Sequence, residues 1–452
     1  MSAPLINLIM LISIIKLTQH YPEMNSNKVT AQSITVYHLI SLITVQTTIK
    51  GGFMSHNIQK TAVISPNQVH DNVEQEVLRR YKAGALNVEA GLCCPTCYEP
   101  GLLEILPGEI LEKDYGCGDP TVHVYPGEKV LDLGSGAGKI CYMLAKKVGP
   151  AGEVIGVDFN DEMLKLARKY IPEMASKLGY ENVRFVKARI QDLALDMEVV
   201  EDFLSHNPVR SLEELSSFDT KCEKLRKDSP LIIDDSVDVV VSNCVLNLVK
   251  KQGRERLFQE IYRVLRLGGR AVISDIVCDE DPTPAILQDP ELWSGCIAGA
   301  FREDQFLEKF EQAGFYGVEV VSYQSEPWKV IDGIEFRSVT VRAFKGKEGR
   351  CYERNQAVIY KGPWKSVTDD DGHVLYRGKR MAVCDKTYQL MTSPTSPYSE
   401  DIVPVPPLNA VPLEEAGPFS CKEAGFRNPR QTKGESYQAN ITSTCCGING
   451  PC

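Results

Sequence analysis

The segment VLDLGSGAG at 130–138 constrains the fold of this chain more than any other feature. Its apolar start predicts a buried strand. The glycines that follow let the backbone turn sharply and approach a ligand with no side chain in the way. A second predicted strand, EVIGVDF, ends near Asp158, whose carboxylate is placed to accept hydrogen bonds from both hydroxyls of a ribose. The pattern therefore predicts a nucleotide-type cofactor at one edge of a sheet.

Strands alternate regularly with helices after this turn. The segments KICYMLAKKVG, DEMLKLARKYIPEMASKLGY and RERLFQEIYRVLRLGG predict helices, and VRFVKARI, VDVVVSNCVLNLV and RAVISDIV predict strands. Such alternation predicts an α/β fold with a parallel, doubly wound, Rossmann-like sheet. We assign this domain to residues 128–344. Within it, residues 194–233 form an insertion in which we expect one or two surface helices.

Other segments flank this domain on both sides. Residues 67–127 predict an N-terminal helical cap that carries the motifs CCPTC and YGCG. Residues 345–392 predict short strands separated by the turn DDDGH, and hence a small β-rich C-terminal domain. From 393 to 452, Pro, Ser and Glu are frequent, which predicts a largely disordered tail that contains cysteines.

The first 53 residues begin with an apolar run, MSAPLINLIMLISIIKLTQ. The run has no basic residue before Lys16, is short for a membrane span and is not followed by a clear cleavage site. We therefore interpret 1–53 as an extension that is disordered or that precedes a natural start at Met54. Membrane tethering is the less favoured alternative, and we expect no stable membrane association.

The composition narrows the choice of partners. A formal net charge of -10 argues against nucleic acid as a partner, because phosphate groups are bound by basic surfaces. A small-molecule substrate fits better. The 15 cysteines lack the dense, even spacing of a disulfide-stapled secreted domain, so we expect a reduced, cytoplasmic protein.

The glycine turn also distinguishes between cofactors. Dinucleotide-binding domains use GxGxxG, whereas LGSGAGK has Lys139 where the third glycine would fall. A dinucleotide or flavin Rossmann domain is therefore the less favoured alternative. The order of motifs resembles the class I S-adenosylmethionine methyltransferases. This resemblance implies that Ile190 and Gln191 lie near the adenine and that Asn243 lies under the methionine part. The remaining candidate cofactor-binding residues are Asp132, Gly134, Ser135, Gly136, Asp158 and Met163.

Three cysteines lie in separate contexts, Cys117 in DYGCGDP, Cys244 in VSNCVLNL and Cys296 in ELWSGCIAG. Methyl transfer to oxygen or nitrogen usually needs a general base, yet none of the seven histidines falls in a strand-end motif. Soft thiolates instead bind soft, three-coordinate centres. Convergent cysteines would hold As(III) and leave its lone pair free to attack a methyl group.

From roughly 67 to 325 the chain resembles the arsenite S-adenosylmethionine methyltransferases, through DYGCG, SNCVLNL and LWSGCIAGAF. The pairing of Gly372 and His373 with Val383 and Cys384 resembles the C-terminal domain of that family. The resemblance implies that the cysteines matching Cys244 and Cys296 bind arsenic. It also implies that those matching Cys117 and one further N-terminal cysteine exchange disulfides and so return oxidised arsenic to As(III). CCPTC supplies Cys94 or Cys93 for that role.

Each cysteine also has a simpler interpretation. Cys244 and Cys296 are small enough to serve only as buried apolar residues, whereas the glycines around Cys117 favour reactivity. The motif CCPTC, with Cys93, Cys94 and Cys97, would be half of a zinc site, but no second half stands at zinc spacing. We expect Cys141, Cys222, Cys278 and Cys351 to be packing or surface residues and leave Cys384 open. The terminal Cys445, Cys446 and Cys452 are either a metalloid-capture group or an accidental cluster.

The sequence thus predicts transfer of a methyl group from S-adenosylmethionine to thiolate-bound trivalent arsenic. The substrate is arsenite or its thiol conjugate, bound by Cys117, Cys244 and Cys296, and thioredoxin or glutathione resets the enzyme thiols. One alternative is a small-molecule C-, O- or S-methyltransferase whose cysteines are structural. Another is a metalloid-binding protein without turnover, which an intact glycine turn disfavours.

Overall fold

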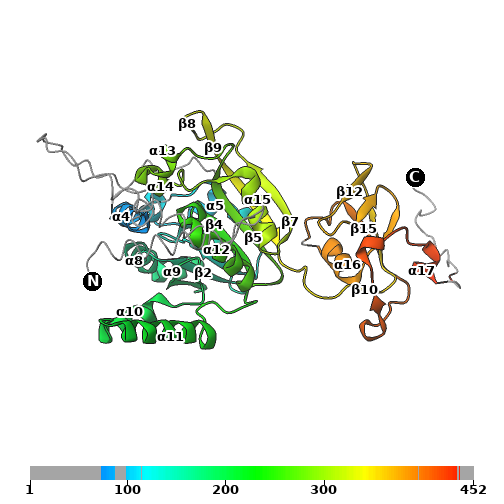
Figure 1. The fold of residues 1–452 in the computed structure, drawn as a ribbon, viewed down its shortest axis with the longest axis horizontal. Coiled ribbons are helices and arrows are strands. Elements are labelled where there is room, and N and C mark those ends of the chain that lie inside the picture. Colours follow the sequence, from blue (N-terminus) through cyan, green and yellow to red (C-terminus); the bar gives the residue numbers. More distant parts are fainter. Residues whose placement is uncertain (1–72, 87–97, 114, 395, 435–436, 438–452) are drawn as a thin grey trace, which may run out of the picture. The chain divides into compact units, whose positions relative to one another are not determined.

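The computed structural model describes residues 73–86, 98–113, 115–394, 396–434 and 437. A β-sheet dominates these residues (Figure 1). It has nine strands in the order β3–β2–β1–β4–β5–β9–β7, with β6 paired to β5 and β8 to β9. The strands are β1 (Lys129–Leu133), β2 (Glu153–Asp158), β3 (Val183–Lys187), β4 (Val237–Asn243), β5 (Leu265–Cys278), β6 (Phe301–Arg302), β7 (Tyr316–Tyr323), β8 (Lys329–Ile331) and β9 (Ile334–Phe344).

The direction of the strands confirms the predicted fold class. Strands β1 to β5 pair in parallel, and β9 joins β5 and β7 in antiparallel fashion. The central strand β1 is flanked on both sides, with Leu131 opposite Ile155 of β2 and Val240 of β4. The buried runs of β1, β2 and β4 are apolar because helices cover both faces of such a sheet.

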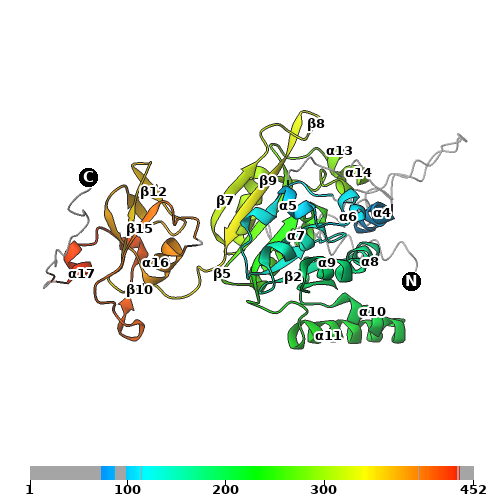
Figure 2. The same cartoon turned by 180° about the vertical axis from the view of Figure 1, so that it is seen from behind.

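Two apolar cores lie on the two faces of the sheet. Leu257, Phe258 and Ile261 of α12 (Lys251–Val264) and Phe306 and Phe310 of α15 (Glu303–Gln312) pack into one core. The other core contains residues of α5 (Pro100–Leu103), α6 (Gly108–Glu112), α7 (Lys139–Val148), α8 (Asp161–Lys169) and α9 (Ile171–Leu178). Figure 2 shows this second set of helices from behind. Helices on both faces make the fold doubly wound.

Short helices surround the carboxyl ends of the parallel strands. Helix α4 spans Val73–Leu86 and packs against α8 and α14 (Pro290–Ser294). This helix lies within the predicted N-terminal helical cap of 67–127. The helical turns η2 (Pro120–His123), η3 (Leu246–Leu248) and α13 (Pro284–Leu287) complete this set.

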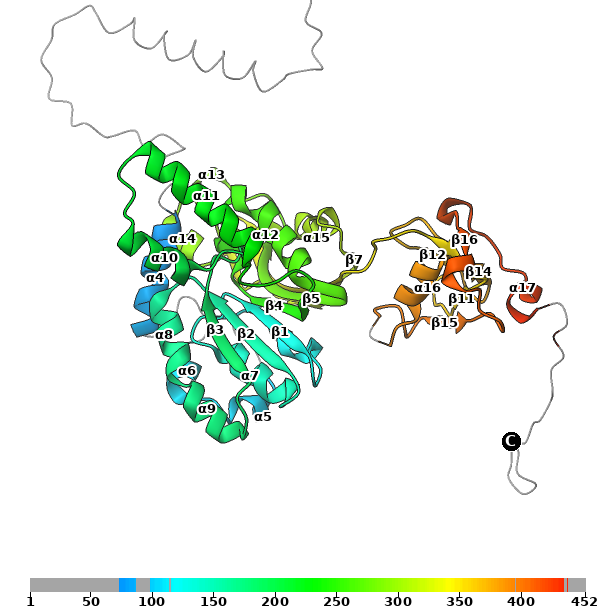
Figure 3. The same ribbon diagram turned by 90° about the horizontal axis from the view of Figure 1, so that it is seen from below.

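The predicted insertion at 194–233 contains two helices, α10 (Met197–His206) and α11 (Leu212–Asp228), which are seen together in Figure 3. Asp196 caps the first helix, and a capping box of Ser211 and Glu214 starts the second. Arg226 of α11 pairs with Asp192 at 2.9 Å. These local signals explain why the segment is helical rather than an irregular loop.

The C-terminal residues form small sheets around a separate apolar core. Strands β14 (Arg380–Ala382), β11 (Ala357–Tyr360) and β15 (Ile402–Val405) make one sheet. Strands β10 (Tyr352–Glu353) and β16 (Gly417–Pro418) pair with each other, as do β12 (Ser366–Thr368) and β13 (Val374–Tyr376). Helices α16 (Asp385–Thr392) and α17 (Pro429–Lys433) and the turns η4 (Leu413–Glu415) and η5 (Cys421–Glu423) complete the region.

The expectation of a largely disordered tail from residue 393 is wrong for 396–434. Strand β15 pairs along its whole length with β11, and Ile402 is buried in the core of this domain. The frequent prolines suggested disorder. Pro404 nevertheless fits in β15, because this strand lies at the edge of its sheet and proline's missing N–H is not needed there. Residues 438–452 and the extension 1–53 lie outside the described residues.

In the part of the chain that the structure describes, no helix has both the length and the apolar character needed to cross a membrane.

Candidate active site

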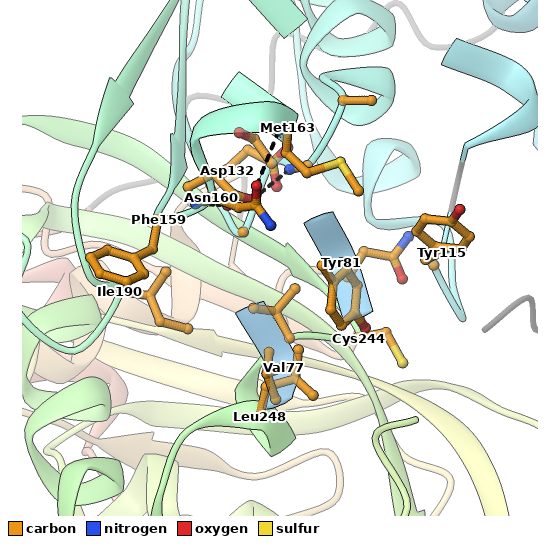
Figure 4. A pocket seen from close by; sticks show the side chains of 18 of the residues that line it. Val77, Tyr81, Tyr115, Asp132, Phe159, Asn160, Met163, Ile190, Cys244 and Leu248 are labelled. Atoms are coloured by element: carbon orange, nitrogen blue, oxygen red, sulfur yellow. Dashed lines mark hydrogen bonds between the residues drawn. The ribbon is translucent and has the colours of Figure 1, made fainter. Parts of the chain in front are cut away.

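A cavity of about 200 Å³ opens at the carboxyl ends of β1, β2 and β4. Figure 4 shows Phe159 and Ile190 toward one end of it and Cys244 and Tyr115 toward the other. The cavity is therefore bounded by the two groups of residues that the sequence singled out, the glycine turn with Asp158 and a cysteine. Its lining includes every predicted cofactor-binding residue, namely Asp132, Gly134, Ser135, Gly136, Asp158, Met163, Ile190, Gln191 and Asn243.

The glycine turn between β1 and α7 leaves backbone open to the cavity. Gly134 and Gly136 have φ of 70° and 51°, in the left-handed region that favours glycine. A Cβ on Gly134 would lie 2.5 Å from Val245, whereas a Cβ on Gly136 would meet nothing within 4 Å. The Ser135 hydroxyl between them is buried and has no hydrogen-bond partner among the described residues. This turn offers both space and a free polar group to a ligand.

Asp158 lies at the end of β2, directly beside that turn. Its Oδ2 accepts a hydrogen bond from the Gly136 N–H and its Oδ1 accepts one from the Asn160 N–H, both at 2.8 Å. Burial raises the pKa of Asp158 above its usual range, and these backbone donors act in the opposite direction. Each carboxylate oxygen keeps a further lone pair for a ligand hydroxyl. The geometry is compatible with the predicted ribose contact.

An apolar wall forms the other side of the cofactor end. Phe159 and Ile190 line the cavity, and the Arg189 guanidinium lies 5.0 Å from the centre of the Phe159 ring. Met163 is 2% exposed and lies at the start of α8, where Asn160 caps the helix. A flat aromatic ligand would find an apolar surface here. Because Gln191 also lines this part, a polar edge of such a ligand has an amide within reach.

Three cysteines cluster at one end of this cavity, and one of them, Cys244, lines it. Cys117, Cys244 and Cys296 are all buried and belong to one apolar cluster, together with Trp293. The sulfurs of Cys244 and Cys296 lie within 4.8 Å of each other and of a carboxylate oxygen of Asp275, a group that does not include Cys117. The Cys296 thiol also donates to the Cys244 carbonyl at 3.0 Å. The structure thus joins three cysteines that stand 127 and 52 residues apart in the sequence.

Cys244 and Cys296 have the same unusual backbone conformation. Their φ values are 64° and 62°, in the left-handed region that residues other than glycine, asparagine and aspartate rarely adopt. Such a conformation costs on the order of 1–3 kcal/mol and persists only where its surroundings impose it. Both residues therefore hold their thiols in place at an energetic cost, which is a pattern typical of functional sites.

The loop that carries Cys117 is held by Asn243. The N–H groups of Cys117 and Gly118 donate to Asn243 Oδ1 at 2.8 and 3.0 Å, and Asn243 Nδ2 donates to the Gly118 carbonyl at 2.7 Å. A Cβ on Gly116 would lie 2.3 Å from that same amide nitrogen. Glycines on both sides of Cys117 allow this close approach. The predicted cofactor residue Asn243 thus also fixes a thiol.

The surroundings of the thiols favour their protonated form. The hydrogen bond with Cys117 raises the pKa of Cys244 well above its usual range, with Cys296 and burial acting in the same direction. Burial is the main cause that raises the pKa of Cys117. Protonated thiols must give up their protons when they bind a metal or metalloid.

Sequence reasoning missed Asp275, which lies with the thiols. One oxygen of this buried carboxyl and the sulfurs of Cys244 and Cys296 lie within 4.8 Å of one another. Burial raises the pKa of Asp275 to about 7 against the lowering effect of backbone donors. The sequence did contain one signal for this residue. Asp275 is the aspartate of the SDIV motif, near the end of an apolar strand, and a buried aspartate in such a position often indicates a functional site.

Tyr81 of α4 is a second residue that the sequence did not single out. Burial and the nearby Cys296 and Cys244 raise the pKa of its phenol well above the usual range. Its ring meets that of Tyr115 edge-on, with ring centres 6.0 Å apart. Next to it, Arg80 donates hydrogen bonds to Ser294 and to the Glu291 carbonyl, and so ties α4 to the segment before Cys296. Helix α4 thus closes the site.

The other cysteines separate into four groups. Cys141 and Cys278 are packing residues, as expected, and donate to Asp132 and to the Phe301 carbonyl respectively. Cys222 is buried within the insertion. Cys351, which we expected to be a packing or surface residue, forms a cluster with Cys384 and Cys421 in the C-terminal region. Lastly, Cys93, Cys94, Cys97, Cys445, Cys446 and Cys452 lie outside the described residues.

Two family models match the chain. The model described as "Methyltransferase domain" matches residues 125–314, which include the glycine turn, Cys244 and Cys296 but not Cys117. The model described as "Domain of unknown function (DUF8838)" matches residues 347–437. The boundary between the two matches agrees with the separation of the large sheet from the C-terminal sheets.

Named relatives match over most of the chain. An arsenite methyltransferase of Aquipseudomonas alcaligenes is 30% identical over 342 residues, which cover 72% of this chain and 87% of that protein. An arsenite methyltransferase of Mus musculus is 24% identical over 84% of this chain and 98% of its own length. The crystal structure of an arsenic (III) S-adenosylmethionine methyltransferase from Chlamydomonas reinhardtii is 26% identical, covers 72% of this chain and 100% of its own, and superimposes with a TM-score of 0.47.

Proposed function

The chain belongs to the arsenite methyltransferase family, and from this premise we propose that it transfers the methyl group of S-adenosylmethionine to arsenic bound by Cys117, Cys244 and Cys296. One observation carries the proposal. Three buried cysteines cluster at the end of a cavity whose other end has a glycine turn and a strand-end carboxylate. A soft nucleophile and a nucleoside-type ligand would thus meet in one space.

The residues of the cavity fit S-adenosylmethionine. The unpartnered Ser135 hydroxyl and the open side of Gly136 suit its polar methionine part, and Asp158 suits its ribose. Phe159 and Ile190 would cover the adenine. When bound, the cofactor supplies an electrophilic methyl group, and the chain contributes position and the exclusion of water.

The thiols would bind arsenite by ligand exchange. Three arsenic–oxygen bonds break and three arsenic–sulfur bonds form, while the three thiol protons leave with the hydroxyl groups as three water molecules. The raised pKa values of Cys117 and Cys244 keep those protons available at neutral pH. Three sulfurs leave the arsenic lone pair free, so that it can take up the methyl group without a general base.

Methylation by the lone pair oxidises arsenic from the trivalent to the pentavalent state, so a reductant is needed for the next cycle. We propose that Cys117 and Cys94 or Cys93 give up two electrons to the arsenic and form a disulfide. Glutathione or thioredoxin would then reduce that disulfide. A reducing, cytoplasmic setting follows from this requirement for free thiols, and arsenite or its thiol conjugate would be the substrate.

The proposal is tested by replacing the sulfurs singly. We expect Cys244→Ser and Cys296→Ser to lower the methylation rate of arsenite at least 100-fold, because a hard hydroxyl replaces a soft thiolate. Binding of S-adenosylmethionine, measured by calorimetry, should stay within a few-fold of wild type. Cys278→Ser is the matched control, since Cys278 lies in the same apolar cluster but outside the thiol group.

Speciation of the arsenic products and quantification of S-adenosylhomocysteine provide the readout. Near wild-type methylation by either serine variant would overturn the proposed arsenic ligands and favour a small-molecule methyltransferase with structural cysteines. Arsenite binding without production of S-adenosylhomocysteine by the wild type would instead identify a metalloid-binding protein without turnover. Quenching of Trp293 fluorescence by arsenite reports binding directly, because this ring packs in the cluster of the three thiols.

A further inference from the structure

A second group of three thiols lies in the C-terminal domain. The sulfurs of Cys351, Cys384 and Cys421 all lie within 4.8 Å of one another, and those of Cys421 and Cys351 are 3.5 Å apart. All three are free cysteines, drawn from separate segments of the domain. None of the three lines the cavity described above or belongs to the cluster of Cys117, Cys244 and Cys296.

Backbone pairing brings the first two of these thiols together. Cys351 directly precedes β10, Cys421 begins η5 shortly after β16, and β10 pairs with β16. The Phe419 N–H also donates to the Cys351 carbonyl at 2.9 Å. The short distance between the two sulfurs is therefore imposed by a local β-ladder and does not depend on a bond between them.

The third thiol is placed by the start of a helix. Cys384 is the N-cap of α16, and its sulfur accepts a hydrogen bond from the Thr387 N–H at 3.3 Å. Arg354 fixes the first turn of this helix through Asp385 at 2.8 Å, and Lys386 donates to the Lys347 carbonyl at 2.8 Å. Burial raises the pKa of the Cys384 thiol, and the hydrogen bonds with Thr387 act in the opposite direction. The cluster is thus rigidly supported from both sides.

Packing alone does not account for the arrangement. The packing cysteines of the large domain, Cys141 and Cys278, each direct their thiol to an oxygen acceptor. Cys421 instead directs its thiol at the sulfur of Cys351. Cys384 is fully buried, whereas Cys351 and Cys421 are half-buried, so the group has a floor and an open side. A ligand can enter from that side.

The number and chemistry of the donors select the ligand. Among the residues that the structure describes, no histidine, aspartate, glutamate or fourth cysteine belongs to this group. Structural zinc sites need four ligands, whereas trivalent arsenic is satisfied by three sulfurs. Three thiolates also neutralise trivalent arsenic completely, while they would leave a net negative charge on a zinc ion in a half-buried site.

We propose that Cys351, Cys384 and Cys421 form a second trithiolate site that binds trivalent arsenic. Binding of arsenite there breaks three arsenic–oxygen bonds and forms three arsenic–sulfur bonds, and the thiol protons leave in three water molecules. No oxidation or reduction takes place. The site binds arsenic whether or not the proposed methyl transfer occurs, so it does not depend on the proposed function.

The test counts arsenic per chain. Full-length protein, reduced with a phosphine and stripped of metals with a chelator, is dialysed against arsenite, and bound arsenic is measured by mass spectrometry. We expect Cys421→Ser and Cys351→Ser each to lose one equivalent relative to wild type. Cys222→Ser, a buried cysteine outside both thiol groups, should lose none. Cys244→Ser should lose a different equivalent, so that the double variant Cys244→Ser/Cys421→Ser loses two.

X-ray absorption at the arsenic edge identifies the ligands. The arsenic that remains in Cys244→Ser and is missing from the double variant should have three sulfur neighbours. Full arsenic binding by Cys421→Ser and Cys351→Ser, in variants that keep the wild-type circular dichroism spectrum, would overturn the proposal. So would one tightly held zinc ion per chain that depends on Cys421 and that arsenite does not displace. Because losses at Cys421 and Cys244 are counted separately, failure of one site leaves the other unaffected.

Discussion

Asp275 shows how one buried carboxyl holds a strained thiol in place. Its Oδ2 accepts from the N–H groups of Leu246 and Asn247 at 2.8 and 3.3 Å, directly after the left-handed Cys244. Its Oδ1 accepts from the Asn247 amide and from the Ile276 N–H, each at 2.8 Å. Four donors on one carboxyl stabilise the chain that follows Cys244, and they offset the cost of its conformation.

We expect Asp275→Asn to destabilise the protein in a pH-dependent way. The new amide turns one acceptor into a donor that faces other donors, at a cost of about 1–3 kcal/mol. In the folded wild type the pKa of Asp275 is about 7, far above the value of about 3.9 expected when unfolded. The folded state therefore binds more protons between these values, and the wild type loses stability as the pH rises from about 4 to about 7.

The free-energy difference between wild type and Asp275→Asn should consequently be largest near pH 4 and smaller near pH 8. Urea unfolding at several pH values measures it. Asp234→Asn is the control, because the Asp234 side chain is 66% exposed. A difference that stays constant or grows with pH would show that burial of Asp275 does not govern its titration.

At the scale of elements, the turn from β1 to α7 contains two glycines that are required for different reasons. Gly134 is needed because a Cβ would collide with Val245, the residue after Cys244. Gly136 is needed because its open side faces the cavity. Gly127 has a similar φ of 83° and equally open surroundings, but it does not line the cavity. The three positions therefore form a natural series.

We expect the alanine variants of these glycines to differ in kind. Gly127→Ala should cost about 1 kcal/mol of stability, from backbone strain alone, and leave S-adenosylmethionine binding unchanged. Gly136→Ala should cost a similar amount of stability but weaken cofactor binding at least 10-fold. Gly134→Ala should be the least stable, because strain and collision add. Thermal unfolding and calorimetry test this order, and equal cofactor affinity in Gly127→Ala and Gly136→Ala would contradict it.

The elements also differ in how far the sequence predicts them. The order of strands and helices in 128–344 followed from periodicity, because buried parallel strands are continuous apolar runs. Strand β15 was missed since its prolines resemble those of disordered tails, and its pairing with β11 is non-local. Asp275 and Tyr81 were missed because their role arises only when distant segments meet. Cys421 pairs with a cysteine 70 residues away, which no local motif reveals.

At the scale of the molecule, the described residues contain separate apolar cores. The cores on the two faces of the large sheet use residues up to Ala343, whereas the C-terminal core uses Val358, Leu375, Met381 and their neighbours. A domain with its own core can unfold as a unit of its own. The two arsenic sites proposed above would then belong to units with independent stability.

We therefore expect two thermal transitions in the full chain, of which S-adenosylmethionine raises only one. At 100 times its dissociation constant, the ligand should stabilise the unit that contains the glycine turn by about 2.7 kcal/mol. Val358→Ala should lower the other transition by about 2 kcal/mol, because Val358 is fully buried in the C-terminal core. Val240→Ala is the matched control, since this equally buried valine of β4 should lower only the ligand-sensitive transition. Differential scanning calorimetry resolves the two events, and a single transition that responds to both substitutions and to the ligand would show that the cores unfold together.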